Sequence, residues 1–142
     1  MMTELEPELQ LLPTDDRPPK VLLVDDDDTQ TDVLQDRLTR QGFVTYVAHA
    51  GHEALDLARR HHPHVVLLDL GLPDVSGLSV CEELSDAPET CDIPVIVVSA
   101  LDGSDIVRRT RAAGGRFYVH KPYDPNVLLT LIENAVRSDE WT

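Results

Sequence analysis

Short apolar runs recur along the chain after Lys20, and segments of helical length separate them. Most of the runs are apolar throughout rather than alternating with polar residues, which is typical of strands in a parallel sheet covered on both faces. The pattern predicts five strands, namely VLLV at 21–24, VTYVA at 44–48, VVLL at 65–68, VIVV at 95–98 and FYV at 117–119.

The segments between the runs place apolar residues three and four positions apart, which is the spacing of one face of a helix. Gly42 and Gly114 suit the C-terminal ends of two of these helices. Strands that alternate with helices predict an α/β fold with a doubly wound, five-stranded parallel sheet. The five stripes are Val33, Leu34 and Leu38; Ala54, Leu55 and Ala58; Leu78, Cys81 and Leu84; Ile106, Val107, Thr110 and Ala113; and Val127, Leu128, Leu131, Ile132, Ala135 and Val136.

The regular pattern divides the chain into three parts. Residues 1–19 are rich in proline and acidic residues and have little apolar periodicity, which predicts a disordered acidic tail. Residues 20–138 carry the strands and helices, and residues 139–142 form a short C-terminal tail. A chain of 142 residues suits one domain with a core of ordinary size.

Composition narrows the classes of partner. The 26 acidic residues outnumber the 12 basic ones, and the formal net charge of -14 opposes binding to nucleic acid or to anionic membranes. No apolar run approaches the roughly 20 residues that cross a bilayer. Cys81 lies on an apolar stripe, which predicts a core position, whereas Cys91 lies in a loop with no evident role. Without a signal peptide or paired-cysteine spacing, we expect a cytoplasmic protein.

Polar residues follow four of the five predicted strands at the point where each strand ends. Asp25 and Asp26 follow the first strand, Asp69 the third, Ser99 ends the fourth, and Lys121 follows the fifth. The carboxyl ends of parallel strands meet at one edge of the sheet, where doubly wound folds bind their ligands. We therefore expect these side chains to converge.

The chemistry of these side chains points to a cation and a phosphoryl group. Two carboxylates about 4 Å apart repel by roughly 4 kcal/mol at an effective dielectric near 20, so a cation must offset them. Carboxylates without clustered cysteines favour a hard ion, and Mg²⁺ is typically held by one or two carboxylates together with water and phosphate oxygens. A lysine and a serine opposite the ion suit a phosphoryl group.

At this point four motifs resemble the receiver domain of two-component response regulators, over about residues 20–138. They occur in the family's order, each at the expected strand end. The resemblance implies a flavodoxin-like (βα)5 fold with strand order 2-1-3-4-5. It also implies a phosphorylation-dependent switch rather than an enzyme, one that assists its own phosphoryl transfer and dephosphorylation. The motifs are KVLLVDDDD, HVVLLDLGLPDVSGL, IPVIVVSA and YVHKPYDP.

By that resemblance Asp69 is the phosphoacceptor and takes its phosphoryl group from a histidine kinase or a histidine phosphotransfer protein. Asp26 and the backbone carbonyl of Gly71 would bind Mg²⁺ directly beside Asp69. Asp25 would act mostly through a coordinated water. The family's metal site is thus expected to be made from the ends of the first and third strands.

The remaining roles come from the last two strands. Lys121, ahead of a cis peptide to Pro122 in the family, would pair with the phosphoryl group. Ser99 would donate a hydrogen bond to it after transfer, and Tyr118 would change rotamer together with Ser99.

The resemblance also implies an output surface on the fourth helix, fifth strand and fifth helix. Here that fourth helix carries Arg108, Arg109 and Arg111, so it is basic on an acidic protein. We expect an unknown downstream protein to bind this surface, with the chain either monomeric or dimeric upon phosphorylation.

The acidic run is longer than the family usually has. Asp27 and Asp28 are expected to open the first helix, where carboxylates favour the positive end of the helix dipole, with Thr29 as a competing cap. The cluster HHPH, with His61, His62 and His64, is interpreted as a solvated turn rather than as convergent metal ligands.

Three alternatives stay open beside a stand-alone receiver. The chain could be a receiver fragment of a longer regulator without its output domain, or a pseudo-receiver that only binds partners; the intact set of Asp26, Asp69, Ser99 and Lys121 argues against the latter. A phosphatase of the haloacid dehalogenase type also uses a strand-end aspartate with Mg²⁺. That family has a second aspartate two residues later, where this chain has Gly71.

Overall fold

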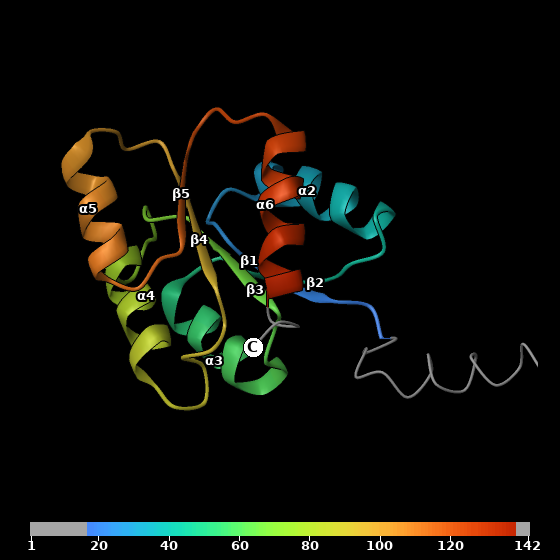
Figure 1. Ribbon diagram of the computed structural model, residues 1–142, viewed down its shortest axis with the longest axis horizontal. Coiled ribbons are helices and arrows are strands. Elements are labelled where there is room, and N and C mark those ends of the chain that lie inside the picture. The colour runs from blue at the N-terminus through green and yellow to red at the C-terminus, as the bar shows by residue number, and fades with distance from the viewer. Residues whose placement is uncertain (1–16, 139–142) are drawn as a thin grey trace, which may run out of the picture.

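The computed structural model describes residues 17–138 (Figure 1). Residues 1–16 of the expected N-terminal tail and the C-terminal tail at 139–142 lie outside the described residues. The strands are β1 (Lys20–Val24), β2 (Val44–Ala48), β3 (Val65–Leu68), β4 (Val95–Ser99) and β5 (Phe117–His120). The helices are α2 (Asp28–Arg40), α3 (Gly51–His61), α4 (Gly77–Asp86), α5 (Ser104–Ala112) and α6 (Pro125–Ser138).

The five strands form one parallel sheet in the order β2-β1-β3-β4-β5, which confirms the predicted doubly wound α/β fold. Apart from an added residue at the start of β1 and at the ends of β4 and β5, the strands match the predicted runs. The chain first builds outward from β1 to β2 and then crosses to the other side of β1 to add β3. The strand order therefore reverses between β1 and β3, the point where such sheets bind ligands.

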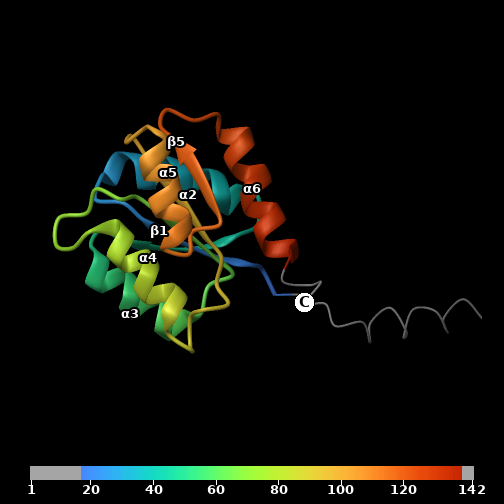
Figure 2. The same ribbon diagram turned by 60° about the vertical axis from the view of Figure 1, so that its left-hand side comes forward.

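Two helical layers cover the sheet, because successive side chains of each strand point to opposite faces. On one face Leu22 and Val24 pack with buried residues of α3, α4 and α5. On the other face Val21 and Leu23 pack with buried residues of α2 and α6. Figure 2 shows β5 between α5 and α6, one helix from each layer. The layers explain why the strands are apolar throughout.

Three residues of the predicted apolar stripes are exposed rather than buried. Val33, Val107 and Val127 have exposed fractions of 64%, 38% and 52%. Val33 lies next to the partly buried Leu34 and Val127 next to the buried Leu128, because a stripe of adjacent apolar residues is wider than the strip of helix in contact with the sheet. The predicted stripes are therefore wider than the buried faces of these helices.

The predictions for two glycines and two cysteines agree with the structure. Gly42 and Gly114 follow α2 and α5 with φ of 94° and 99°, a conformation that glycine adopts at helix ends without steric cost. Cys81 is buried and its burial raises the pKa of the thiol to about 11, whereas Cys91 is exposed. Within residues 17–138, no helix combines the length and apolar character that spanning a bilayer requires.

Two buried threonines allow a paired test of how hydrogen bonding affects stability. Thr90 and Thr110 are only 1% and 2% exposed. The Thr90 hydroxyl donates a hydrogen bond to the Leu84 carbonyl at 2.8 Å, whereas the Thr110 hydroxyl has no hydrogen-bond partner among the described residues. We expect Thr110→Val to raise the free energy of unfolding by about 1 kcal/mol, because it removes an unpaired buried hydroxyl. Thr90→Val should lower it by about as much. Urea denaturation measures both, and equal signs for the two variants would contradict the assignment.

Candidate functional site

The predicted strand-end residues converge at the carboxyl edge of the sheet. Lys121 follows β5, and its Nζ donates hydrogen bonds to Asp25 Oδ2 at 3.0 Å and to Asp69 Oδ2 at 2.9 Å. The side chains of Lys121, Asp25 and Asp69 are only 16%, 14% and 15% exposed. The peptide bond from Lys121 to Pro122 is cis, as expected. The lysine thus bridges two carboxylates that come from adjacent strands.

Burial and this bridge shift the protonation equilibria in the site. Burial raises the pKa of Asp25, and this effect outweighs the opposing hydrogen bonds from the Asp27 amide and from Lys121. Burial acts in the opposite direction on Lys121, but hydrogen bonds to Asp69 and Asp25 outweigh it, so the pKa of Lys121 is raised. Lys121 therefore keeps its positive charge at neutral pH and remains a fixed cation beside the two carboxylates.

The three aspartates expected to serve a metal lie together. One oxygen each from Asp25, Asp26 and Asp69 fall within 4.8 Å of one another. Asp26 is exposed at the rim, while the Gly71 amide donates to Asp69 Oδ1 at 2.9 Å and places Gly71 next to the cluster. These donors are all hard oxygens that leave room for water, which fits Mg²⁺ and not a thiolate- or imidazole-seeking ion.

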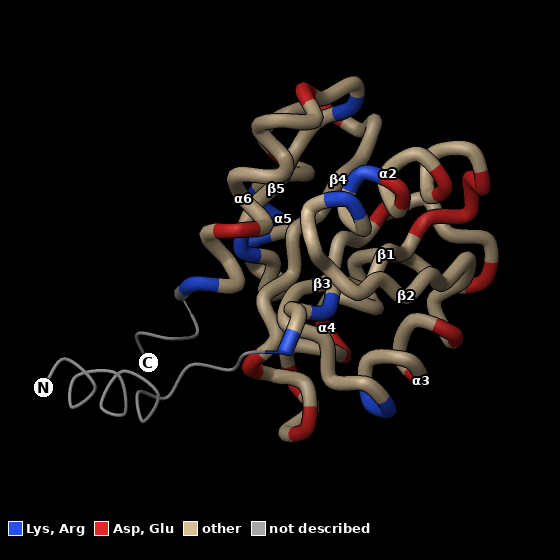
Figure 3. The backbone as a smooth tube through the Cα atoms, turned by 90° about the vertical axis from the view of Figure 1, so that its right-hand side faces the viewer, with Lys and Arg blue, Asp and Glu red and all other residues tan. Residues whose placement is uncertain are grey.

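The rest of the acidic run has a structural role, as predicted. Asp27 is the N-cap of α2, and its Oδ1 accepts hydrogen bonds from the backbone amides of Thr29 at 3.0 Å and Gln30 at 3.2 Å. Asp28 lies in the first turn of α2, where a carboxylate favours the helix dipole. Thr29, the competing cap, donates to the cap instead. Figure 3 shows the run as a continuous acidic stretch of the chain where α2 begins.

Sequence reasoning missed His49, which follows β2 at the same edge of the sheet. Its Nδ1 donates to the Asp25 carbonyl at 3.0 Å, and its Nε2 lies 3.2 Å from Asp28 Oδ1. The hydrogen bond to that carbonyl, with the neighbouring carboxylates, raises the pKa of His49. The signal was present, since His49 follows its strand as directly as Asp69 and Lys121 follow theirs. His49 fastens the loop that carries the aspartates to the edge strand.

Sequence reasoning also missed Asp74, in the loop between β3 and α4. Helix α3 has no side-chain cap of its own at Ala50, and Asp74 supplies one from a distance. Its two carboxylate oxygens accept hydrogen bonds from the amides of Gly51 at 2.8 Å and His52 at 3.0 Å. The same loop carries Gly71, so the cap holds part of the candidate site against α3.

The Asp74 cap predicts a dependence of stability on pH. Amide hydrogen bonds, from His52 first and then Gly51, lower the pKa of Asp74 below its ordinary value of 3.8. The ionised Asp74 therefore stabilises the folded state at any pH above the ordinary pKa of aspartate. This stabilisation is lost as the pH falls through the lower pKa of Asp74 in the folded state. We therefore expect Asp74→Asn to lower the unfolding midpoint at neutral pH, and this difference to narrow below about pH 4.

Thermal unfolding of both proteins over a range of pH measures the effect. Asp32→Asn, which changes an exposed aspartate on α2, is the control and should show no such narrowing. A difference between Asp74→Asn and wild type that is independent of pH would show that the carboxylate charge does not matter to the cap.

The two residues expected to act as a switch hold one peptide segment between them. Ser99 is buried at the end of β4, and its Oγ accepts a hydrogen bond from the Leu101 amide at 3.2 Å. The Tyr118 hydroxyl donates to the Leu101 carbonyl, and Tyr118 packs against the α3–α5 side of the core. Ser99 and Tyr118 are therefore connected through Leu101, at the start of the loop that leads to α5.

The arginines of the expected output surface lie on α5 and are exposed. Arg108 pairs with Asp105 one turn earlier, with Nη2 to Oδ1 at 2.9 Å and both side chains open to solvent. Arg109 lines a shallow pocket of about 230 Å³ between α4 and α5, and Arg111 lies in the last turn of α5. The basic face predicted from the sequence is thus available to a partner, while its role stays a prediction.

Comparison with known proteins gives concordant matches. Residues 21–133 match the family described as the response regulator receiver domain. The chain is 40% identical over 102 residues to the polar-differentiation response regulator DivK of Brucella ovis, which covers 72% of this chain and 83% of that protein.

Two solved structures extend the comparison to the fold. A CheY-like response regulator receiver domain protein from Methanospirillum hungatei superposes with a TM-score of 0.81 at 24% identity, covering 87% of this chain and 97% of that chain. The BeF3-activated DrrB receiver domain gives a TM-score of 0.75 at 30% identity, covering 84% of this chain and 98% of that one.

Proposed function

Because the chain belongs to the response regulator receiver domain family of two-component signalling, we propose that Asp69 accepts a phosphoryl group from a phosphohistidine. The donor is a histidine kinase or a histidine phosphotransfer protein. The observation that carries the proposal is the pair of hydrogen bonds from Lys121 to Asp25 and Asp69, at the point where the strand order reverses. A fixed cation beside a carboxylate nucleophile is what a transferring phosphoryl group requires.

In the proposed transfer, an Asp69 carboxylate oxygen forms the new bond to phosphorus while the bond from phosphorus to the donor's imidazole nitrogen breaks. The imidazole keeps the electron pair and takes a proton from solvent. Lys121, now bonded to Asp69 Oδ2, donates to the phosphoryl oxygens as their charge approaches. Because the charge was placed before the reaction, the chain assists its own modification without being an enzyme for another substrate.

Mg²⁺ suits the three-aspartate cluster, with Asp26 and the Gly71 carbonyl as direct ligands and Asp25 acting through water. When bound, the ion would neutralise negative charge on the phosphoryl oxygens. Asp26 is the exposed member of the cluster, so it meets the incoming group first. Lys121 holds Asp25 and Asp69 before the phosphoryl group arrives, and this keeps Asp69, the nucleophile, oriented.

A groove beside Lys121 offers a route for the donor protein. It measures about 580 Å³, lies between the start of α2 and the segment that joins β5 to α6, and includes the exposed apolar side chain of Val33. A donor protein that docks its apolar side chains here would be held next to Lys121, which is hydrogen-bonded to Asp69. The lining residues are Thr29, Gln30, Val33, Ala100, Lys121, Pro122, Tyr123 and Pro125.

The proposed signal passes from Ser99 to the α5 surface through Leu101. A phosphoryl group on Asp69 gains a hydrogen bond when the Ser99 hydroxyl turns toward it, and Ser99 then pulls on the Leu101 amide that it now holds. The Leu101 carbonyl moves with it, which breaks its hydrogen bond with Tyr118 and frees the ring to turn inward. The change at β5 and α5 alters the face that carries Arg108, Arg109 and Arg111.

A downstream protein that prefers this state would bind the phosphorylated form more tightly, by a coupling of typically 1–3 kcal/mol. We propose that the phosphoryl transfer and the partner binding take place in the cytoplasm, where Cys81 and Cys91 stay reduced.

Beryllofluoride, a phosphoryl mimic, tests the proposal with the full chain labelled for NMR. With Mg²⁺ present we expect chemical-shift changes around Asp69 and along residues 104–119. Asp26→Asn should need at least about tenfold more Mg²⁺ than wild type to reach the same chemical-shift changes, because it loses a direct metal ligand. Asp28→Asn removes the same charge from the same acidic run but outside the cluster, and should behave as wild type.

Each contrary outcome has a distinct meaning. Shifts confined to the loops around Asp26, Asp69 and Lys121 would show that the signal does not leave through α5 and β5. An equal Mg²⁺ requirement in wild type and Asp26→Asn would remove the metal assignment. The absence of any response to beryllofluoride would identify a receiver that only binds partners.

A further inference from the structure

The carboxylate expected to bind the metal most directly is the one that no side chain holds. Lys121 donates hydrogen bonds to Asp25 and Asp69, whose side chains are largely buried. Asp26 is exposed, and within residues 17–138 its side chain makes no hydrogen bond or ion pair. The position of this carboxylate therefore depends on the backbone to either side of it.

On one side of Asp26 lies the peptide unit that joins it to Asp25. The Asp25 amide donates to the Ala48 carbonyl at 3.0 Å. The paired register of β1 and β2 ends at Val24 and Ala48. Beyond it, the Asp25 carbonyl accepts a hydrogen bond from His49 Nδ1 at 3.0 Å. A side chain thus holds this carbonyl at the point where the strand pairing stops.

The hydrogen bond from His49 restrains more than one oxygen atom. A peptide unit is planar, so the carbonyl of one residue, the amide of the next and both Cα atoms move together. Holding the Asp25 carbonyl therefore restrains the Cα atom of Asp26. On the other side, the Thr29 amide fixes Asp27 as the N-cap of α2. Asp26 is the single residue between a restrained peptide unit and a capped helix.

His49 is itself held at two further atoms. Its amide donates to Glu53 Oε1 at 2.8 Å, in the first turn of α3. Its Nε2 lies 3.2 Å from Asp28 Oδ1, in the first turn of α2. Nδ1 carries a hydrogen in the imidazolium and in one neutral tautomer, so either form of the ring can donate to the Asp25 carbonyl. The hydrogen bond therefore does not depend on the charge of His49.

His49 is not placed as a metal ligand. In the part of the chain that the structure describes, the ligand atoms that converge belong to Asp25, Asp26 and Asp69. Both ring nitrogens of His49 already face oxygen atoms of other residues. His49 can therefore act on a bound ion only through the aspartates.

We propose that His49 is a positioning residue for magnesium binding, because its hydrogen bond to the Asp25 carbonyl orients Asp26 toward the ion. This inference rests on the proposed function, in which Asp26 is a direct ligand. Without the bond, the peptide unit between Asp25 and Asp26 gains freedom that metal binding must then remove, which lowers the affinity. The transfer step itself should not change, since the bond between Lys121 and Asp69 does not involve His49.

Titration of the full chain with Mg²⁺ at one fixed pH, without a phosphodonor and followed by NMR of the backbone amides, tests the proposal. We expect His49→Ala to need about fivefold more Mg²⁺ for half-saturation than wild type, because it loses one hydrogen bond that orders a ligand. His49→Asn should stay within about twofold of wild type, because the asparagine side-chain amide can donate to the same carbonyl. The His49 side chain is 46% exposed, so neither change empties a buried site.

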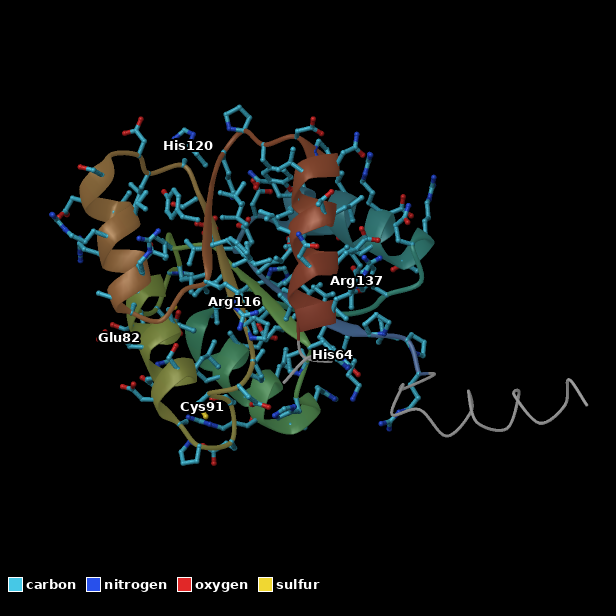
Figure 4. All side chains as sticks on the ribbon, viewed as in Figure 1. His64, Glu82, Cys91, Arg116, His120 and Arg137 are labelled. Atoms are coloured by element: carbon cyan, nitrogen blue, oxygen red, sulfur yellow. The ribbon has the colours of Figure 1, made fainter. Side chains whose placement is uncertain are left out.

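His120→Ala is the matched control. Figure 4 shows His120 at the carboxyl end of β5, which is the edge strand on the other side of the sheet. Its side chain is also 46% exposed and also faces an aspartate, Asp102, at 3.9 Å, but this contact lies outside the metal cluster. The Mg²⁺ concentration for half-saturation should equal that of wild type.

The rate of phosphorylation by acetyl phosphate separates positioning from general damage to the site. At saturating Mg²⁺, His49→Ala should react as fast as wild type, whereas a variant with a disturbed site would be slower at every Mg²⁺ concentration. A lowered rate at saturating Mg²⁺, or a loss of affinity that His49→Asn does not restore, would overturn the proposal.

Asp26→Asn in the same titration distinguishes the two ways in which the proposal can fail. If Asp26→Asn binds Mg²⁺ weakly while His49→Ala binds it as wild type does, only the role of His49 is wrong. If both variants bind Mg²⁺ as wild type does, the metal assignment in the proposed function is wrong, and the role of His49 is wrong with it.

Discussion

Asp69→Asn is expected to gain no phosphate from acetyl phosphate and Mg²⁺, whereas the wild-type chain gains one phosphoryl group. The side chains are nearly isosteric, but an amide is neutral and lacks the nucleophilic carboxylate oxygen that must form the bond to phosphorus. Lys121 also loses one of its two carboxylate partners in the variant. Intact mass spectrometry of the full chain, with and without the donor, measures the outcome directly.

The acidic run supplies a matched control for this experiment. Asp27→Asn makes the same chemical change close to the site, and asparagine caps helices about as well as aspartate, so α2 should remain intact. This control should be phosphorylated as fully as wild type. If Asp69→Asn instead gains one phosphate with the wild-type yield, another residue is the acceptor and the role assigned to Asp69 is wrong.

Gly77→Ala is expected to lower the free energy of unfolding by about 2 kcal/mol or more. A Cβ at this position would lie 2.4 Å from Leu70 Cα and 2.8 Å from the Asp69 carbonyl oxygen. Both are backbone atoms, so the clash can be relieved only by moving the first residue of α4 away from the strand end that carries Asp69. The better helix propensity of alanine recovers less than about 1 kcal/mol of this. Urea denaturation measures the free energy of unfolding. Phosphorylation by acetyl phosphate measures how much function the variant loses.

Gly71→Ala is the comparison, in the loop between β3 and α4. The nearest atom to its added Cβ is Asp69 Oδ1 at 3.8 Å, an ordinary contact, and the backbone carbonyl remains in place. We expect a change within about 0.5 kcal/mol and normal phosphorylation. Equal destabilisation by the two substitutions would mean that the loop is sensitive to any added side chain, and that the close approach of Gly77 to Leu70 is not the cause.

The sheet and the centre of the site were predictable because both follow from features local in sequence. A strand covered on both faces is apolar throughout, and a residue directly after such a strand must lie at its carboxyl edge. Asp25, Asp69 and Lys121 could therefore be placed together before their distances were known. The capping role of Asp27 followed from its position one residue ahead of a helix.

Other features depend on contacts between distant segments and left a weaker trace in the sequence. Asp74 caps a helix that begins 23 residues earlier, and the residues around Gly51 give no indication that the capping side chain comes from a later loop. The exposure of Val33 depends on how wide a strip of α2 the sheet covers, which periodicity alone does not define. His49 differs, because the rule that found Asp69 applies to it and was not extended to the edge strand β2.

The cap that Asp74 provides makes the start of α3 a reporter for a different part of the molecule. The first amide protons of a helix normally exchange quickly with solvent, since they have no intrahelical acceptor. In α3 the amides of Gly51 and His52 are bonded to the loop that carries Gly71, so their exchange is slowed only while that loop is closed. Hydrogen exchange at these two amides thus records the opening of the loop beside Asp69, in residues that take no part in its chemistry.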